Sequence, residues 1–487
     1  MDMSQSLAMI APEVLLSLSG LVLLLAAAWL GDRAHRAISI AACVALGAAF
    51  FMVAPTVCKG TVGPEADAFF GQFRADAFAG FAKLMIYAAA GAVLVIAPAF
   101  FTRLGAMRAE FPILVLFAVL GMSVMVSATD LLTLYVGLEL NSLSAYVLAS
   151  FLRHDTRSAE SGLKYFVLGA LASGILLFGM SLVYGFTGTT SFEGIRVALI
   201  GGLPMGALFG LTFMLAGLAF KISAAPFHMW TPDVYEGAPT PVTAFFASAP
   251  KVAAIALLAR VSIEAFGQQA EAWRQIVIFA ALLSIVIGAL GAIGQANVKR
   301  LLAYSSINNV GFILIGLAAA TPAGVSALLV YLAIYVVMTI GSFVAVLMLR
   351  DADGDAVEDI SALAGLSTTR PALAWCLAAL MFSLAGIPPL FGFWGKFVVF
   401  QAAVQADLVV LAAIGIAASV IGAFYYIKIV KIMFFDDAAD RITGRSDGWH
   451  WALLLICAAI VSPLGYLLTG ILGELADQAA AALFLMP

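Results

Sequence analysis

Residues 383–396 read Ser-Leu-Ala-Gly-Ile-Pro-Pro-Leu-Phe-Gly-Phe-Trp-Gly-Lys, and residues 221–230 read Lys-Ile-Ser-Ala-Ala-Pro-Phe-His-Met-Trp. Both stretches lie inside apolar runs long enough to cross a membrane, and both combine proline with lysine. Proline removes a backbone donor and clashes with the preceding helical turn, so each run is expected to be a broken helix. Free backbone groups at membrane depth are tolerated only inside protein or beside a hydrated cavity. An ordinary proline kink is the alternative at each position.

The composition around these stretches is that of a membrane protein. The chain has 487 residues, of which 63% are hydrophobic and 11% charged, whereas a soluble domain carries about 25% charged residues. So few charges cannot cover the surface of a water-soluble enzyme, and a net charge of -4 offers no basic face for nucleic acid. The four cysteines and four histidines are scattered, with no CxxC pair and no nucleotide-binding glycine motif. We therefore expect no cofactor-binding site and no metal site in this chain.

Fourteen apolar runs have about the 20 residues that a helix needs to cross the hydrocarbon core. They lie at 11–30, 37–55, 77–101, 111–128, 131–151, 161–186, 204–226, 241–266, 273–295, 301–320, 324–349, 372–400, 405–434 and 450–471. The sequence therefore predicts an all-α polytopic membrane protein with about 14 transmembrane helices. The first run follows no basic region and no evident cleavage site, so we expect it to be a retained helix.

The basic residues between these runs predict the orientation. Thirteen lie in the loops after odd-numbered helices: Arg33, Arg36, Arg103, Arg108, Arg153, Arg157, Lys299, Arg300, Arg350, Arg370, Lys431, Arg441 and Arg445. Four lie in the loops after even-numbered helices: Lys59, Arg74, Arg196 and Arg274. Because basic loops mark the cytoplasmic side, both termini are expected on the opposite side of the membrane, outside the cytoplasm.

The two broken helices, the seventh and the twelfth, are five spans apart. Interrupted helices at corresponding places in two halves indicate an internal repeat with a transport site. Helices 4–8 and 9–13 are therefore expected to form two five-helix repeats, and because five is odd the two copies must be inverted. The predicted division is 1–110 for helices 1–3, 111–270 and 271–435 for the repeats, and 436–487 for helix 14.

Few ionisable residues remain inside the predicted spans. Glu139 lies nine residues past Asp130, which is about 13 Å deep at 1.5 Å per residue. Intramembrane charges face protein or water and are functional candidates by default, with a buried ion pair that only fixes helix packing as the alternative. Lys428 and Arg260 lie near helix ends and are expected to reach the interface. Five lysines remain inside the spans: Lys83, which lies only seven residues from Asp76 and could also reach the interface, Lys164, Lys221, Lys251 and Lys396.

His228 follows the break in the seventh helix. Histidine titrates near neutral pH, which makes His228 a candidate relay toward Lys251, and a histidine bonded to freed backbone is the alternative. The following segment, 231–241, is expected to be a proline-rich turn on the cytoplasmic side. Asp233 and Glu236 could collect protons at an entrance there, or they could belong to a solvated loop.

Long motifs in the chain resemble the antiporter-like membrane subunits of respiratory complex I. They are 130–145 (DLLTLYVGLELNSLSA), 161–170 (SGLKYFVLGA), 220–244 (FKISAAPFHMWTPDVYEGAPTPVTA), 300–315 (RLLAYSSINNVGFILI) and 383–396. Within that family the chain is most similar to the N type. It ends after helix 14 without a long lateral helix, carries Lys396 where M-type members usually have glutamate, and matches the N type around Lys164.

The resemblance implies a proton-translocating subunit of the proton-pumping NADH:quinone oxidoreductase. NADH, FMN, iron–sulfur clusters and quinone would belong to partner subunits. The chain would contact the lipid bilayer and other membrane subunits, especially the neighbouring antiporter-like subunit and the small helix-rich subunits. The alternatives are a subunit of a multi-subunit sodium/proton antiporter or membrane-bound hydrogenase with the same fold, and a non-transporting scaffold.

The resemblance also implies a proton relay of one carboxylate, four lysines and one histidine. Glu139 would pair with Lys221. Lys251 would be the central relay, with the histidine nearby, and the last lysine would lie on the exit side. The complete set is Glu139, Lys164, which would modulate the Glu139–Lys221 pair, Lys221, His228, Lys251 and Lys396.

Overall fold

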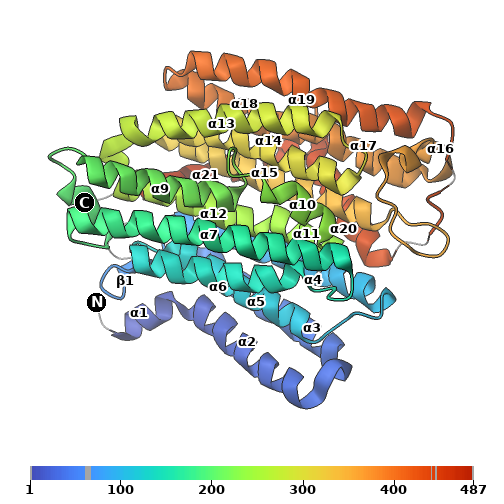
Figure 1. Ribbon diagram of the computed structural model, residues 1–487, viewed down its shortest axis with the longest axis horizontal. Helices are drawn as coiled ribbons and strands as arrows, with labels where there is room; N and C mark the ends of the chain where they lie inside the picture. The colour runs from blue at the N-terminus through green and yellow to red at the C-terminus, as the bar shows by residue number, and fades with distance from the viewer. Residues whose placement is uncertain (1–2, 61–66, 440, 445–446, 485–487) are drawn as a thin grey trace.

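The computed structural model describes residues 3–60, 67–439, 441–444 and 447–484. Long helices lie side by side and form nearly all of it (Figure 1). In these residues the strands are β1 (Asp67–Ala68) and β2 (Phe73–Arg74), a short antiparallel pair. The predicted all-α polytopic class is confirmed.

The predicted helices 1–3 are three long helices preceded by a short one. Their bounds are α1 (Met3–Met9), α2 (Ala11–Leu30), α3 (His35–Cys58) and α4 (Ala77–Arg103). Asp76 starts α4, because its side chain accepts a hydrogen bond from the Ala79 amide at 2.8 Å and so satisfies one of the free donors of the first turn. Helices α3 and α4 pack along each other.

The predicted helices 4–8 form the next part of the bundle. They are α5 (Glu110–Ser127), α6 (Leu131–Ala149), α7 (Thr156–Thr187), α9 (Met205–Ile222) with α10 (Trp230–Gly237), and α11 (Thr240–Ala247) with α12 (Ala249–Arg260), with the short α8 (Phe192–Ala198) before α9. Helices α5 and α6 approach very closely, because a Cβ added to Gly121 would lie 2.5 Å from the Asn141 nitrogen. This close packing fixes the face of α6 that carries Glu139.

The predicted helices 9–13 follow the same plan. They are α13 (Ala270–Ile293), α14 (Val298–Ala318), α15 (Pro322–Leu347), α17 (Pro371–Ala385) with α18 (Phe391–Gln405), and α19 (Val409–Phe435), with the short α16 (Leu366–Thr369) before α17. Helices α13 and α14 again meet at a glycine, since a Cβ on Gly288 would lie 2.5 Å from the Asn308 nitrogen.

Both predicted breaks are present, and they have the same local geometry. A left-handed residue follows the first half of each broken helix: Ser223 with φ 65° after α9, and Gly386 with φ 82° after α17. A cis peptide bond follows in each turn, at Ala225–Pro226 and at Pro388–Pro389. In Figure 1 the path from α9 to α10 runs opposite to the path from α17 to α18, as expected for inverted copies.

Two predictions about helix boundaries are wrong, and one predicted span contains a break that was not expected. The predicted helix 241–266 corresponds to the single span Thr240–Ala265. It is interrupted at Ser248 between α11 and α12, because Pro250 has no amide donor and Ser248 instead donates its hydroxyl to the Ala244 carbonyl at 2.7 Å. Most of the predicted turn 231–241 is the helix α10, where a proline is tolerated in the first turn. The predicted helix 450–471 is two helices, α20 (Gly448–Val461) and α21 (Thr469–Phe484), joined by a 3₁₀ turn at Pro463–Leu468.

The helices are long and apolar enough for a bilayer. Among the described residues, 12 helical segments have the length and composition of a membrane span, and one of these, Ala11–Cys58, contains both α2 and α3. The shorter apolar helices are Pro371–Ala385, which is half of a broken span, and Gly448–Val461.

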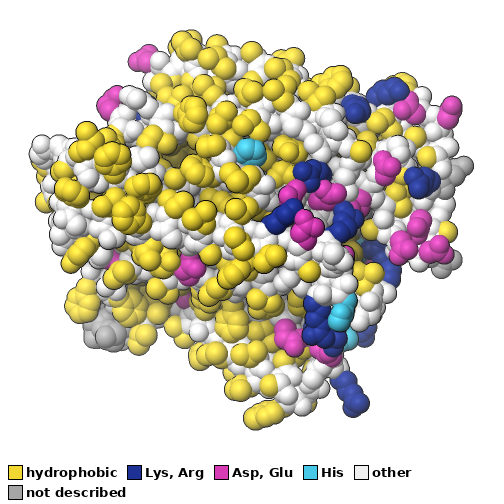
Figure 2. Space-filling view, in the orientation of Figure 1, with side chains coloured by type: hydrophobic (Ala, Val, Ile, Leu, Met, Phe, Trp, Pro, Cys, Tyr) yellow, Lys and Arg dark blue, Asp and Glu magenta, His cyan; other side chains and the backbone are white. Residues whose placement is uncertain are grey.

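Charged side chains gather at one end of the bundle, which we call the basic end. Figure 2 shows Lys, Arg, Asp and Glu near α10 and α16, whereas most of the remaining visible surface is apolar. Helix α1 and strand β1 lie at the opposite end (Figure 1). Eight of the basic residues predicted in loops lie in α-helices of the described structure: Arg36, Arg103, Arg157, Arg196, Arg274, Lys299, Arg300 and Lys431. Arg445 lies outside the described residues.

Candidate functional site

Three lysines lie beside helix breaks in the interior of the bundle. Lys221 is in the last turn of α9, and Lys251 is in the first turn of α12. Lys396 is on α18, the second half of the other broken helix. A helix end leaves backbone groups without partners inside the helix. The breaks therefore provide polar surroundings for cations in an otherwise apolar interior.

Lys221 contacts a hydroxyl rather than a carboxylate. Its Nζ donates to Ser142 Oγ at 2.7 Å, and the Ser142 hydroxyl donates to the Leu138 carbonyl at 2.7 Å. Glu139 lies one helical turn from Ser142, and its Oε1 is buried without a hydrogen-bond partner. Within the described chain, no ion pair joins Glu139 to Lys221. Ser142 thus makes the lysine contact that the resemblance assigns to Glu139.

Lys251 is the most deeply buried of the three lysines, with 1% of its surface exposed. Its Nζ donates to Ser306 Oγ, and Ser306 Oγ shares a 2.5 Å hydrogen bond with the Tyr335 hydroxyl. The ring centre of Tyr235 lies 5.6 Å from the Nζ, within reach of a cation–π interaction. The amine therefore contacts one hydroxyl that can both donate and accept, and a second hydroxyl is bonded to the first.

A second set of neutral polar groups continues along α14. Tyr331 donates to Asn309 Oδ1 at 2.5 Å, and Asn309 Nδ2 donates to the Tyr426 hydroxyl at 3.3 Å. The Tyr426 hydroxyl is also hydrogen-bonded to Ser305, the neighbour of Ser306 in the chain. These groups link α14, α15 and α19.

Lys396, on the second half of its broken helix, contacts the end of the first half. Its Nζ donates to the carbonyl of Ala385, the last residue of α17, at 2.9 Å. The same Nζ donates to Ser419 Oγ at 3.2 Å. The ring centre of Phe312 is 4.6 Å away. A groove of about 660 Å³ between α18 and α19 includes Lys396 in its lining.

The structure places Lys164 at the basic end, which corrects its predicted position inside the membrane. Its side chain is 40% exposed and pairs with Glu160 at 2.6 Å and Asp233 at 2.8 Å. The reason is that α7 begins at Thr156, five residues earlier than predicted, so Lys164 lies only about two turns from the helix start.

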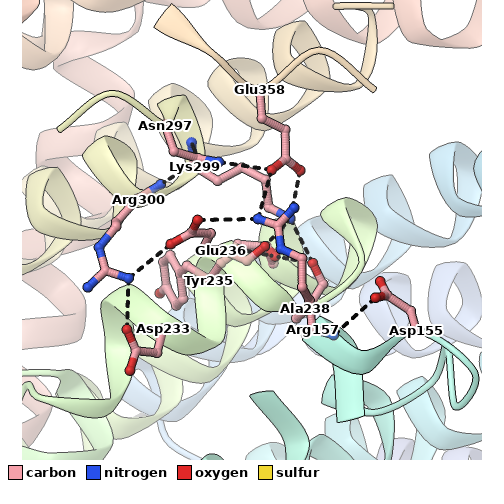
Figure 3. Close-up of polar contacts among 11 residues, drawn as sticks. Asp155, Arg157, Asp233, Tyr235, Glu236, Ala238, Asn297, Lys299, Arg300 and Glu358 are labelled. Carbon is pink, nitrogen blue, oxygen red and sulfur yellow. Dashed lines mark hydrogen bonds and ion pairs between the residues drawn. The ribbon is translucent and has the colours of Figure 1, made fainter. Parts of the chain in front are cut away.

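Lys164 belongs to a set of ion pairs around α10, and Figure 3 shows other members of this set. Arg300 Nη1 lies 2.7 Å from Asp233 and 2.9 Å from Glu236, and Arg157 Nη2 lies 3.2 Å from Glu236. We call this set the end cluster, and its members are Arg157, Lys164, Asp233, Glu236, Lys299, Arg300 and Glu358. It corrects the expectation of a solvated loop, because both α10 carboxylates are paired with residues of α7 and α14.

Lys299 and Glu358 complete the end cluster on its inner side. Lys299 Nζ donates to the carbonyls of Glu236 and Ala238 at 2.9 and 2.8 Å, and lies 3.3 Å from Glu358. Burial raises the pKa of the Glu358 carboxyl. Lys299, the Asn297 amide and Arg157 together lower this pKa by more than burial raises it, so it lies below its usual value.

His228 lies half-buried in the turn between α9 and α10. Its Nδ1 is buried without a hydrogen-bond partner, and in the described residues no hydrogen bond joins it to Lys251. Its role as a relay stays a prediction.

Two of the three cations expected at the interface, Lys83 and Arg260, are instead buried in ion pairs, whereas Lys428 is exposed on α19. Lys83 is 3% exposed and lies 2.7 Å from Glu13 of α2. Arg260 is fully buried, contacts Asp76 at 2.7 and 2.9 Å, and lies 2.5 Å from Glu264. Distance along the helix could not reveal this, because the partners and the covering segments come from other parts of the chain. The available signal was the presence of Glu13 and Glu264 inside predicted apolar runs.

The comparisons with known proteins identify the family. The family described as NADH:quinone oxidoreductase/Mrp antiporter, TM, matches residues 128–422, which is more than half of the chain. The chain belongs to this family. NADH-quinone oxidoreductase subunit N of Erythrobacter litoralis is 71% identical over 485 residues, 100% of both chains. The protein of the same name from Rhizorhabdus wittichii is 60% identical, over 99% of this chain and 100% of its own. The predicted similarity to N-type members of the family is confirmed.

Solved structures show how widely the family fold is shared. A chain of respiratory complex I from Thermus thermophilus matches with a TM-score of 0.80 and 32% identity, over 95% of this chain and 98% of its own. An Mrp complex from a Dietzia species matches with a TM-score of 0.82 and 23% identity, over 99% and 98%. The second likeness shows the fold alone. Because the TM-scores are nearly equal, it is the sequence relatives, not the overall shape, that point to the N type.

Proposed function

We propose that this chain is the N-type, proton-translocating membrane subunit of a bacterial proton-pumping NADH:quinone oxidoreductase. The observation that carries the mechanism is the set of three interior lysines, each bonded to neutral groups beside a helix break. The full-length relatives named NADH-quinone oxidoreductase subunit N support the identity of the complex. Other membrane subunits of that complex are the partners, and the electron-transfer cofactors belong to them or to the peripheral subunits.

The lysine surroundings explain how a proton can be held and released. Desolvation disfavours the charged form of a buried amine, and a neighbouring carboxylate favours it. Lys251 has hydroxyl partners, so its ammonium is only partly compensated. A charge that moves nearby then decides whether the amine keeps its proton. Ser306 and Tyr335 can accept that proton on one side and donate one on the other.

Glu139 and Lys221 would form the input side of the relay. Glu139 is one turn from the serine that binds Lys221, so a small movement of α9 would exchange the Ser142 contact for a carboxylate contact. We propose that Lys164 acts on this pair through Asp233 and α10, rather than by direct contact. His228 lies in the turn that such a movement would displace.

Lys396 would be the exit-side lysine. Its contacts with Ala385 and Ser419 are neutral, as at the other two interior lysines. The end cluster and the other basic residues support a cytoplasmic basic end, with both termini in the periplasm. Residues 111–270 and 271–435 would be the inverted repeats, flanked by 1–110 and 436–487.

The test is proton pumping by the assembled complex in sealed vesicles, measured per NADH oxidised. Replacement of Lys251 by alanine is expected to lower the ratio of protons to electrons, because the central amine is lost. Lys428→Ala is the matched control, since Lys428 is an exposed lysine on α19. An undiminished ratio in Lys251→Ala would contradict the proposal, and proteins of another complex co-purifying with the chain would contradict the assigned complex.

A further inference from the structure

An ion pair lies buried outside the part of the chain that matches the family. Lys83 of α4 and Glu13 of α2 are each about 95% buried or more, and 2.7 Å separates Nζ from Oε1. Both residues precede the matched range 128–422. The relay proposed above does not use them.

The Glu13 carboxylate lacks hydrogen bonds. In the described structure both of its oxygens are buried and accept none, because the short contact with Lys83 brings the charges together without hydrogen-bond geometry. An unsatisfied buried polar group costs about 1–3 kcal/mol, and more when it is charged. Water is the usual partner where space allows.

The space is present beside Lys83. A pocket of about 220 Å³ lies among α1, α2, α3 and α4, and its lining includes Lys83, Asp76, Thr56 and Pro12. This is far more than the roughly 10–15 Å³ that one water needs. Asp76 supplies a second charged group to the wall and is itself fixed by Arg260. The pocket is therefore polar enough and large enough to hold several waters.

The inner side of the pair faces a hydroxyl pair. Tyr87 follows Lys83 by four residues on α4, and side chains at this spacing lie on the same face of a helix. The Tyr87 hydroxyl shares a 2.5 Å hydrogen bond with Ser123 Oγ of α5, and both residues are buried. Lys83 and Glu13 thus lie between a pocket and groups that can pass a proton.

We propose that Lys83 and Glu13 form a further proton-transfer site, which releases protons through this pocket at the end opposite the basic end. The Lys83 ammonium, which lines the pocket, gives its proton to a pocket water, leaving a neutral amine and giving hydronium. The Glu13 carboxylate takes the next proton from the interior by way of the Tyr87–Ser123 hydroxyls and becomes a carboxylic acid. The acid then passes that proton to the Lys83 amine, which restores the carboxylate and the ammonium. This inference rests on the proposed function.

The competing explanation is a structural ion pair, which a neutral pair of similar size should replace without loss. The test is the double variant Glu13→Gln/Lys83→Met in the complete complex, beside Lys251→Ala. The expected result is normal assembly with a loss of protons pumped per NADH comparable to that of Lys251→Ala. A double variant that assembles and pumps normally would overturn this inference. The proposed function fails separately, if Lys251→Ala pumps normally.

A second measurement does not depend on removing the pair. Thr56→Cys, in a background with the exposed Cys58 replaced by serine, places a thiol in the pocket wall. A charged, membrane-impermeant thiol reagent added from the pocket side of the intact complex is expected to label it. Phe51→Cys is the matched control, because Phe51 lies on the same helix with 76% exposure on the apolar outer surface and should stay unlabelled. An unlabelled Thr56→Cys would mean that the pocket is closed to water, and would overturn the proposal.

Discussion

Buried cations in the middle of this protein and buried cations near its ends have different partners. In the described chain, Lys251 and Lys396 are bonded to hydroxyl and carbonyl oxygens. Arg260, in contrast, is held by the carboxylates of Asp76 and Glu264. A carboxylate offsets the desolvation of a cation, whereas neutral groups offset it only in part. The comparison indicates a fixed charge at Arg260 and exchangeable charges at Lys251 and Lys396. The Lys83–Glu13 pair differs from Arg260, because its carboxylate accepts no hydrogen bond and its lysine lines a pocket.

The largest expected effect is the loss of Arg260. Arg260→Ala leaves two buried carboxylates without their main partner, which destabilises a protein by about 3–5 kcal/mol. We expect little assembled complex and a lower thermal midpoint for what remains, measured on purified membranes and by thermal denaturation. Arg36→Ala, at an exposed position, is the control and should change stability by less than about 0.5 kcal/mol. Equal assembly and an equal thermal midpoint in the two variants would contradict the conclusion that Arg260 carries a fixed structural charge.

Replacement of Lys251 should separate stability from function. Methionine has a similar volume, and volume-conserving core replacements usually cost less than about 1.5 kcal/mol. Ser306 keeps Tyr335 as a partner in the variant. We therefore expect Lys251→Met to assemble with a nearly normal thermal midpoint but to pump fewer protons per NADH. A loss of assembly as severe as that of Arg260→Ala would show that Lys251 is a structural charge.

A carboxylate placed beside Lys251 should convert an exchangeable charge into a fixed one. Ser306→Asp puts an acid at the atom that Lys251 already contacts, and the resulting ion pair stabilises the ammonium. Each 1.36 kcal/mol of added stabilisation corresponds to about a tenfold change in proton affinity. We expect pumping to slow in vesicle assays while assembly is preserved. Ser306→Ala controls for loss of the hydroxyl, and a Ser306→Asp complex that pumps faster than this control would contradict the comparison.

The smallest expected effect is the pH dependence that Glu358 contributes. Its folded-state pKa lies below the unfolded value, because the charges around it outweigh its burial. A group of this kind adds stability above its unfolded pKa and loses it as the pH falls through the folded pKa. The thermal midpoint of the complex should therefore fall between neutral and acidic pH less steeply in Glu358→Gln than in the parent. If the thermal midpoint changed equally with pH in both proteins, Glu358 would not contribute to the loss of stability at acidic pH.

Features set by residues close together in the sequence, such as the proline breaks, could be predicted. Contacts between residues far apart in the sequence, such as the partner of Lys83, could not. The breaks at Pro226 and at Pro388 follow from local chemistry, since proline cannot donate a backbone hydrogen bond. The Ser248 break was hidden because a single proline near it lies in a continuous apolar run. The partner of Lys83 was missed because it is 70 residues away, and packing of α2 near α4 brings the two together.

The site residues divide in the same way. Lys221, Lys251 and Lys396 were found because a charge in an apolar run is conspicuous on its own. Lys164 was placed wrongly because its depth depends on where α7 begins, and Asp155 caps that helix five residues earlier than the apolar pattern predicts. The hydroxyls of Ser142 and Ser306 carry no such signal, since serine is common in membrane helices and only their position beside a lysine makes them notable.

Helix α10 connects α7 and α14 through ion pairs on both sides. It is eight residues long, its charged face is attached to α7 on one side and to α14 on the other, and its chain leads back through a seven-residue turn to α9. Because the two attachments lie on different helices, α7 and α14 cannot slide past each other without stretching these contacts or moving α10. Such a movement of α10 would displace the turn that joins it to the end of α9, where Lys221 lies.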